Sequence, residues 1–151
     1  MKKIFITGGH FAPAKAVIDK LSGWEIFYLG RKYAMEDEKT EALEFREIKN
    51  AHYLVITTGR LQRKFFVNWS QSVKALLKIP WGFIQSFFYL LKYRPDVILS
   101  FGGYVALPVV INAWFLDIPV ITHEQTKSLG LANKIIALLA KKTLDKTPRN
   151  F

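Results

Sequence analysis

The stretch PDVILSFGGYVALPVVINAWFLDIPVITHEQ, residues 95–125, contains the pattern that decides the fold. An apolar run ends in a pair of glycines, a helix is expected at 106–117, and a second apolar run at 118–123 ends in polar residues. Strand, glycine turn, helix and strand in this order are typical of a βαβ unit, whose two strands run parallel. We therefore expect a parallel sheet.

The same alternation extends over most of the chain. Strands are expected at 3–7, 24–30, 52–59, 95–103 and 118–123, and helices at 13–21, 70–93, 106–117 and 130–142. The helix at 70–93 is expected to be interrupted near Pro80 and Gly82, and the acid-rich segment 31–50 to form a mobile helix or loop. The predicted fold class is α/β, a parallel sheet with helices on both faces, in a single domain at 1–151.

Composition and charge limit the possible functions. The chain has no cysteine, which excludes a disulfide framework and a cysteine-based zinc site, and its three histidines lack a metal-ligand spacing, so no metal is expected. The N-terminal apolar run is too short for a signal peptide, and the absence of cysteine fits a reducing cytoplasm. The net charge of +10 indicates an affinity for phosphate, in nucleic acid or in anionic lipid.

The segment 63–94 is both basic and aromatic. Its uncharged run at 79–91 is shorter than the about 20 apolar residues that a helix needs to cross a bilayer. Aromatic and aliphatic residues flanked by Lys and Arg are typical of a helix lying in a membrane interface, although these aromatics could instead belong to the core. No nucleic-acid readout motif is present, so nucleic acid is the less favoured partner. The candidate membrane-interface residues are Phe65, Phe66, Trp69, Lys74, Lys78, Trp81, Phe83 and Phe87.

Three polar clusters follow predicted strands: TGGH at 7–10, FGGY at 101–104 and HEQ at 123–125. Ligands of parallel sheets bind beyond the carboxyl ends of the strands. A glycine pair can turn tightly and bring N–H groups close to an anion, and the helix N-terminus that follows adds partial positive charge. Two such loops side by side would suit a diphosphate, whereas the alternative is that each pair only turns a strand into a helix. The candidate diphosphate-binding residues are Thr7, Gly8, Gly9, Gly102, Gly103 and Tyr104.

Histidines accompany two of these clusters. His10 lies at the start of the first helix, where an imidazole could take a proton from an attacking hydroxyl group; the alternative is a helix cap or a solvent-facing side chain. His123 and Glu124 could hydrogen-bond substrate hydroxyls or orient each other, or could be purely structural. Neither glycine loop has a dinucleotide-binding or P-loop sequence, so those nucleotide sites lack support.

The segment 94–137 resembles the acceptor-binding half of the MurG-type glycosyltransferases of peptidoglycan synthesis. The pattern of that family is P-D-V, G-G-Y-V-S-x-P, I-P-x-x-x-H-E-Q-N and G-x-x-N, and TGGH with Pro13 matches the second half of its G-G-T-G-G-H-x-x-P loop. The departures are Phe5 and Ile6 in place of the first glycine pair, Ala106 in place of Ser, and Thr126 in place of Asn. The matching residues are Pro95, Asp96, Val97, Gly102, Gly103, Tyr104, Val105, Pro108, Ile118, Pro119, His123, Glu124, Gln125, Gly130 and Asn133.

The resemblance implies a Rossmann-like N-terminal domain of a GT-B glycosyltransferase. Such enzymes transfer N-acetylglucosamine from the co-substrate UDP-GlcNAc to an undecaprenyl-diphosphate-linked muropeptide, converting lipid I to lipid II, and they need no metal or cofactor. They work as peripheral proteins at the cytoplasmic face of the cell membrane. The resemblance also implies that His10 is the base for the acceptor hydroxyl and that five residues contact substrate: His123, Glu124, Gln125, Thr126 and Asn133.

The family pattern continues into a donor-binding domain that this sequence does not contain, so we expect the chain to be inactive alone. Two further possibilities stay open from the sequence. The chain is a subunit of a split lipid-linked sugar transferase with a separate donor-domain chain, or it is a non-catalytic module that binds lipid diphosphates or anionic membrane surfaces.

Overall fold

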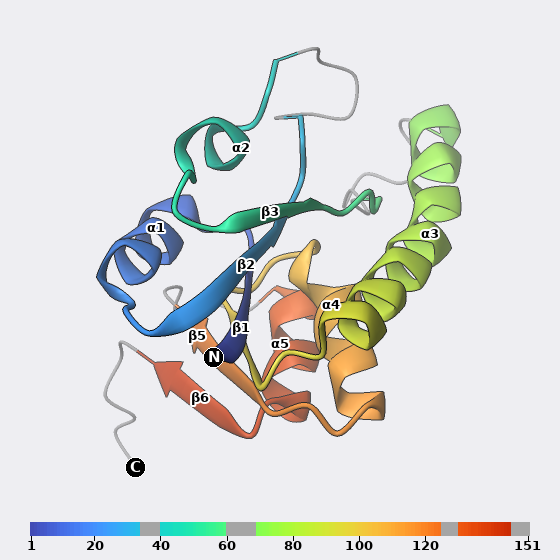
Figure 1. Cartoon of the computed structure of the whole chain (residues 1–151). Coiled ribbons are helices and arrows are strands. Elements are labelled where there is room, and N and C mark those ends of the chain that lie inside the picture. The colour runs from blue at the N-terminus through green and yellow to red at the C-terminus, as the bar shows by residue number, and fades with distance from the viewer. Residues whose placement is uncertain (34–39, 60–68, 125–129, 146–151) are drawn as a thin grey trace.

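The structure is a computed structural model that describes residues 1–33, 40–59, 69–124 and 130–145, with the backbone alone described at 69–76, 124 and 142–145. It has three layers, a parallel sheet between two layers of helices (Figure 1). The strands are β1 Lys2–Thr7, β2 Trp24–Gly30, β3 His52–Val55, β4 Val97–Ser100, β5 Val120–Glu124 and β6 Lys142–Asp145. The helices are α1 Phe11–Lys20, α2 Leu43–Glu47, α3 Trp69–Tyr93, α4 Ala106–Phe115 and α5 Leu131–Leu139.

The sheet has the strand order β3-β2-β1-β4-β5-β6, and every neighbouring pair is parallel. The direction in which strands are added reverses between β1 and β4. The loops that follow these two central strands therefore lead to helices on opposite faces of the sheet. Ligands of doubly wound sheets bind in the crevice between such loops. The α/β fold class predicted from the sequence is confirmed.

Both faces of the sheet are covered. Helices α1 and α2 lie on one face and α3, α4 and α5 on the other (Figure 1). In β1, Ile4 and Ile6 pack with Ile18 of α1, while Phe5 points to the opposite face and packs with Leu90 of α3 and Val109 of α4. Burial on both sides explains why the central strands are continuous apolar runs and do not alternate with polar residues.

Helix α3 continues through Pro80, so the predicted interruption near Pro80 and Gly82 is wrong. A proline inside a helix removes one backbone hydrogen bond, but tertiary contacts hold this helix in place. A Cβ atom added at Gly82 would lie 2.6 Å from Cβ of Thr58, so the glycine allows close packing on the loop after β3. Gln85 of α3 also accepts a hydrogen bond from the Thr57 backbone N–H at 2.8 Å.

A buried polar contact joins α3 to α4. The Asn112 side-chain amide of α4 donates to the backbone oxygen of Phe83 and to Oγ of Ser86, both at 2.7 Å. Asn112 and Ser86 are buried, and a buried amide left without partners is costly, so this pairing fixes how the two helices pack.

The C-terminal end of the described chain differs from the prediction. The helix expected at 130–142 ends at Leu139, and the strand β6 follows it after two residues. The Lys141 N–H donates to the backbone oxygen of Val120, which starts the parallel pairing of β6 with β5. A four-residue strand with charged ends carries no apolar run that would predict it. The strands expected at 52–59 and 95–103 are also shorter than predicted, and 31–50 contains the short helix α2.

Candidate functional site

Buried hydroxyl groups lie side by side near the carboxyl ends of three neighbouring strands. Thr7 of β1, Ser100 of β4 and Thr122 of β5 lie in register and are buried. Thr7 Oγ1 donates to the backbone oxygen of Leu29 at 3.0 Å, and Thr122 Oγ1 donates to that of Ser100 at 3.3 Å. Ser100 Oγ accepts from the Gly102 N–H at 3.2 Å. These hydroxyl groups form hydrogen bonds near the edge at which the loops leave the sheet, and the repeated sequences FIT, ILS and VIT are the signal that could have revealed them.

The two glycine loops lie against each other, as predicted. The Gly9 N–H donates to the backbone oxygen of Gly102 at 2.9 Å, and a Cβ atom added at Gly103 would lie 3.3 Å from the Gly9 nitrogen. Gly8 has a φ of +146°, and a Cβ atom there would lie 2.8 Å from the backbone carbon of Phe101. No side chain could be accommodated at Gly8, so glycine is required there for the loops to meet.

The glycine amides already donate within the chain. Besides Gly9 and Gly102, the N–H of Gly103 donates to Oδ1 of Asn133 at 2.7 Å. Asn133, expected to contact substrate, therefore supports the second loop from α5, and it crowds Gly102, where a Cβ atom would lie 2.8 Å from the same oxygen. An anion bound at this edge must be held by other donors. The binding roles of these residues stay predictions.

His10 is the residue immediately before α1. Its backbone is extended, with φ −108° and ψ 96°, and its side chain makes no capping hydrogen bond. His10 thus occupies the N-cap position without capping the helix through its side chain, and the residue is half-buried. The first N–H groups of α1 point toward the same edge of the sheet and favour negative charge there. Its role as a base stays a prediction.

The HEQ cluster is described only in part. The ring of His123 lies 5.6 Å from the ring of Phe101, between centroids, so β5 places this histidine beside the second glycine loop. Its Nδ1 atom is buried and has no hydrogen-bond partner among the described residues. Glu124 is the last residue of β5 and pairs with β6 through its backbone. The predicted contacts of Gln125 and Thr126 lie outside the described residues.

A cation that sequence reasoning missed lies at the same edge. Arg31 follows β2 directly, and its Nε donates to Oε1 of Glu44 in α2 at 3.1 Å. Burial acts to lower the pKa of Arg31, but Tyr104 and Glu44 outweigh it and raise the pKa. The Tyr53 hydroxyl donates to the Arg31 backbone oxygen at 2.7 Å. Arg31 was missed because nothing in the 31–50 segment marks it apart from the other charged residues there.

The candidate membrane-interface residues fall in or before α3. Trp81 and Phe87 are exposed, whereas Phe83 and Lys78 are half-buried and Lys78 has an interaction partner. Trp69 and Lys74 are part of α3, but their side chains are outside the description, as are Phe65 and Phe66 altogether.

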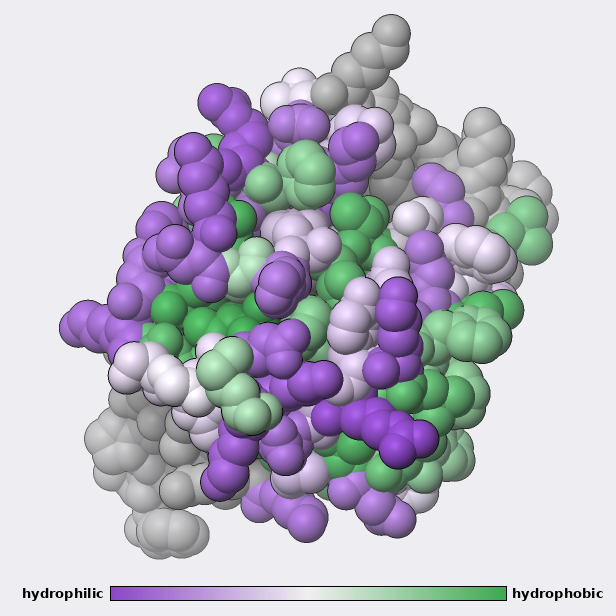
Figure 2. All heavy atoms as spheres, viewed as in Figure 1, coloured by the Kyte–Doolittle hydropathy of each residue, from purple (hydrophilic) through white to green (hydrophobic). Residues whose placement is uncertain are grey.

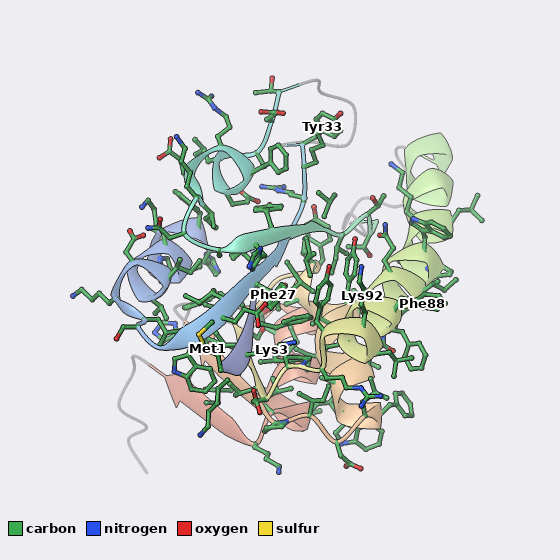
Figure 3. All side chains as sticks on the ribbon, in the orientation of Figure 1. Met1, Lys3, Phe27, Tyr33, Phe88 and Lys92 are labelled. Atoms are coloured by element: carbon green, nitrogen blue, oxygen red, sulfur yellow. The ribbon has the colours of Figure 1, made fainter. Side chains whose placement is uncertain are left out.

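The exposed apolar residues of α3 follow a regular spacing that the candidates only partly anticipated. Five of them recur at intervals of four and three along one side of the helix, which we call the α3 stripe: Leu77, Trp81, Ile84, Phe88 and Leu91. Figure 2 shows hydrophobic surface gathered over the α3 side of the molecule, and in Figure 3 Phe88 points away from the sheet. Trp114 and Phe115 at the end of α4 are exposed as well. Helix α3 therefore has an apolar outer side that no other part of the described chain covers.

Neither a membrane-spanning helix nor a metal-binding cluster is found among the described residues. No helix there is long and apolar enough to cross a membrane. Nor do the described ranges bring together three or more His, Cys, Asp or Glu side chains that would hold a metal ion.

Comparison with solved structures finds a matching fold. The crystal structure of MurG from Acinetobacter baumannii aligns with a TM-score of 0.76 and 27% identity, covering 100% of this chain and 43% of that one. The UDP-GlcNAc 2-epimerase of Methanocaldococcus jannaschii aligns with a TM-score of 0.53 and 18% identity, over 97% of this chain and 40% of that one, which shows a shared fold alone.

Comparison with known sequences finds bacterial relatives and a family. A protein of Streptococcus mutans serotype c named UDP-N-acetylglucosamine–N-acetylmuramyl-(pentapeptide) pyrophosphoryl-undecaprenol N-acetylglucosamine transferase is 39% identical over 140 residues, covering 89% of this chain and 37% of the relative. A Streptococcus pneumoniae protein of the same name is 36% identical over 148 residues, 94% of this chain and 40% of the relative. The chain thus spans about two fifths of the length of these relatives. The model of the glycosyltransferase family 28 N-terminal domain matches residues 7–144, and the chain therefore belongs to that family.

Proposed function

We propose that this chain is the acceptor-binding part of a glycosyltransferase that transfers N-acetylglucosamine from UDP-GlcNAc to an undecaprenyl-diphosphate-linked muropeptide. The relatives at 36–39% identity carry the name of this reaction. The observation that carries the proposal is the crossing of the two glycine loops, where Gly9 bonds Gly102 at the point at which strand order reverses. The proposal is also supported by the sequence positions of His10, just before α1, and of Arg31, just after β2.

The proposed chemistry assigns a role to each group at this edge. The acceptor diphosphate binds beyond β1 and β4, where the N-terminus of α1 favours negative charge. His10 accepts the proton of the acceptor hydroxyl as that oxygen attacks the anomeric carbon of the donor sugar, and UDP leaves. The donor sugar is held by a donor-binding domain, on the same polypeptide or on a separate chain. The glycines at the crossing keep the loops in contact and leave anion binding to side chains and to α1.

The α3 stripe supports a peripheral position on the membrane. We propose that it lies in the interface of the anionic cytoplasmic leaflet, which carries the lipid acceptor. Trp81 and Phe88, which are 54% and 64% exposed, would lose contact with water on insertion. Lys92 and Arg94 near the C-terminal end of α3 add positive charge that anionic lipid attracts, by about 1 kcal/mol per residue near the surface.

A reconstituted transfer reaction tests the proposal. The chain is combined with the donor-binding half of the Streptococcus mutans relative, and transfer of labelled N-acetylglucosamine from UDP-GlcNAc to lipid I in anionic vesicles is measured. We expect transfer above the level of the donor half alone. His10→Ala is expected to lower turnover by at least about 100-fold, the usual contribution of a general base. His52→Ala, at an exposed histidine that starts β3, is the matched control and should retain turnover.

The other outcomes have separate meanings. Unchanged turnover in His10→Ala would remove this residue from the catalytic role. Binding of lipid I without any transfer would instead support a non-catalytic lipid-diphosphate module. Absence of both binding and transfer would contradict the proposal.

A further inference from the structure

We propose that Arg31 is a phosphate-binding residue for the diphosphate of the lipid acceptor. The proposal rests on the proposed function and assigns the recognition of one phosphate to a residue outside the two glycine loops. It follows from the hydrogen bonds at the loop crossing, from the position of Arg31 and from how its side chain is held.

The loop crossing leaves a need for donors. The N–H groups of Gly9, Gly102 and Gly103 donate to the backbone oxygen of Gly102, to Ser100 Oγ and to Asn133 Oδ1. A diphosphate carries several strong acceptor oxygens, and each requires a hydrogen-bond donor or a cation once water is displaced. The N–H groups at the N-terminus of α1 supply some of these donors, and we assign the others to a guanidinium group.

The register of the sheet places Arg31 beside this crossing. Thr7 of β1 pairs with Leu29 of β2, so Arg31 lies two residues past this pair on its strand, as Gly9 does on the neighbouring strand. The side chain also reaches the second loop, because Tyr104, which follows Gly103, interacts with the guanidinium and raises the pKa of Arg31 against the effect of burial. Arg31 therefore lies at the carboxyl end of β2, and its side chain interacts with Tyr104 beside the second glycine loop.

The guanidinium is held in a definite orientation before any ligand binds. Glu44 accepts its Nε hydrogen at 3.1 Å, and the Tyr53 hydroxyl fixes the backbone oxygen of Arg31 at 2.7 Å. The N–H of Ala42 donates to the backbone oxygen of Lys32, which ties the start of α2 to the same segment. Little side-chain entropy is then lost when the group binds a phosphate.

The contact with Glu44 involves only one of the nitrogens of the guanidinium group. The hydrogen bond from Arg31 to Glu44 uses Nε, so the terminal amino groups are not the donors in that contact. The Arg31 side chain is 35% exposed, while the Glu44 side chain is only 10% exposed. A guanidinium group has five N–H donors, so the donors other than Nε can bind phosphate oxygens at this edge.

Lys32, the next base along the chain, has a different environment. Its Nζ lies 5.5 Å from the ring centroid of Tyr33 and 5.7 Å from that of Phe45, so it stacks on aromatic rings at the α2 side. Among the described residues from 30 to 33, Arg31 is the base whose side chain interacts with the second glycine loop.

The test compares two soluble prenyl phosphates that differ by one phosphate group. Farnesyl diphosphate and farnesyl monophosphate are titrated into the chain, and Kd is measured by calorimetry for the wild type, Arg31→Gln and Arg31→Lys. In Arg31→Gln we expect the Kd for the diphosphate to rise about 10-fold and that for the monophosphate to rise clearly less, because one charge-assisted contact is lost. Arg31→Lys keeps the charge without the planar fork, and about a threefold rise is expected for the diphosphate.

Arg46→Gln is the matched control, since it removes the same charge from an exposed residue of α2 and should leave both Kd values unchanged. A wild type that prefers the diphosphate, with an equal loss of both ligands or no loss in Arg31→Gln, would overturn the role of Arg31 and leave the proposed function intact. A wild type that does not prefer the diphosphate would overturn both. If Arg31→Gln does not fold by circular dichroism, Arg31→Lys decides between the same outcomes.

Discussion

The edge of the sheet at the glycine loops differs from the outer side of α3 in whether its groups have partners within the chain. At the edge, the N–H groups of Gly9, Gly102 and Gly103 all have partners within the chain, and a Cβ atom added at Gly8 or Gly102 would lie 2.8 Å from a neighbouring atom. On α3, large apolar side chains such as Trp81 and Phe88 are exposed. The backbone N–H groups of the first region are satisfied within the chain. The exposed apolar surface of the second region is stabilised only when another molecule covers it.

This difference indicates how each region could be recognised in other members of the family. The edge depends on residues that cannot change without moving two loops, so its geometry follows from sterics and hydrogen bonding. The α3 stripe requires only apolar side chains at intervals of three and four on an exposed side. Substitutions at the edge should therefore affect folding, whereas substitutions in the stripe should affect binding and leave stability unchanged.

The largest effect is expected at the loop crossing. Gly8→Ala forces a Cβ atom to within 2.8 Å of the Phe101 backbone and keeps a φ of +146°, so the free energy of unfolding should fall by about 3 kcal/mol from strain and overpacking. Gly23→Ala is the control, since Gly23 also has a positive φ, +80°, but nothing lies within 4 Å of its added Cβ. About 1 kcal/mol is expected there. Urea unfolding followed by tryptophan fluorescence measures both.

Equal losses in the two variants would show that backbone conformation alone, and not contact between the loops, requires glycine at Gly8. That result would remove the steric half of the comparison. A loss in Gly8→Ala that exceeds the control by about 2 kcal/mol would support it.

The sequence predicted the fold class and the meeting of the two loops because both follow from local patterns. Apolar runs separated by helical spacing predict a parallel sheet, and a parallel sheet brings the carboxyl ends of its strands to one edge. The sequence did not predict which atoms accept hydrogen bonds from the backbone N–H groups of the glycines. The bonds from Gly103 to Asn133 and from Gly9 to Gly102 join residues far apart in the chain, and no local pattern specifies such partners.

Three other features were not predictable for similar reasons. The strand β6 depends on pairing with β5, the continuity of α3 through Pro80 depends on its packing against Thr58 and α4, and the position of Arg31 depends on the register of β2. Each is decided by tertiary contacts that outweigh local propensity. The exposed side of α3 was anticipated only in part, since Phe83 is half-buried while Phe88 is exposed.

An intermediate effect is expected on the α3 stripe. In the double variant Trp81→Gln and Phe88→Gln, partition into vesicles containing anionic lipid should weaken roughly 30-fold, or about 2 kcal/mol, if each side chain loses about half of its burial free energy. The free energy of unfolding should change by less than about 0.5 kcal/mol, because both side chains are exposed. Leu43→Gln on α2, at a residue 62% exposed on the opposite face of the sheet, is the control for partition.

Vesicle flotation measures the partition, and urea unfolding measures the stability. Unchanged flotation of the double variant would contradict the membrane role of the stripe. A large loss of stability would show that these side chains pack within the folded chain, and the contrast between the two regions would then fail.

The smallest effect concerns the tyrosine hydroxyls behind the edge. Burial, together with the neighbouring Tyr28 and Glu44 and against the effect of Arg31, raises the pKa of Tyr53, and burial likewise raises the pKa of Tyr28. A raised folded-state pKa gives stability that is fully present below the unfolded tyrosine value of about 10 and is lost as pH rises above it. Tyr53→Phe should cost about 1 kcal/mol at neutral pH, through loss of its hydrogen bond to Arg31, and should make the alkaline fall in stability less steep.

Urea unfolding between about pH 8 and about pH 11 measures this slope. Tyr28→Phe removes the weaker hydrogen bond to the Gly8 backbone oxygen, at 3.2 Å, and should reduce the slope as well with a smaller loss at neutral pH. If a double variant with Tyr28→Phe and Tyr53→Phe keeps the wild-type slope, these hydroxyls titrate alike in the folded and unfolded chain. The alkaline fall in stability would then arise elsewhere in the chain, and the two phenols would contribute to the edge only through the hydrogen bonds measured at neutral pH.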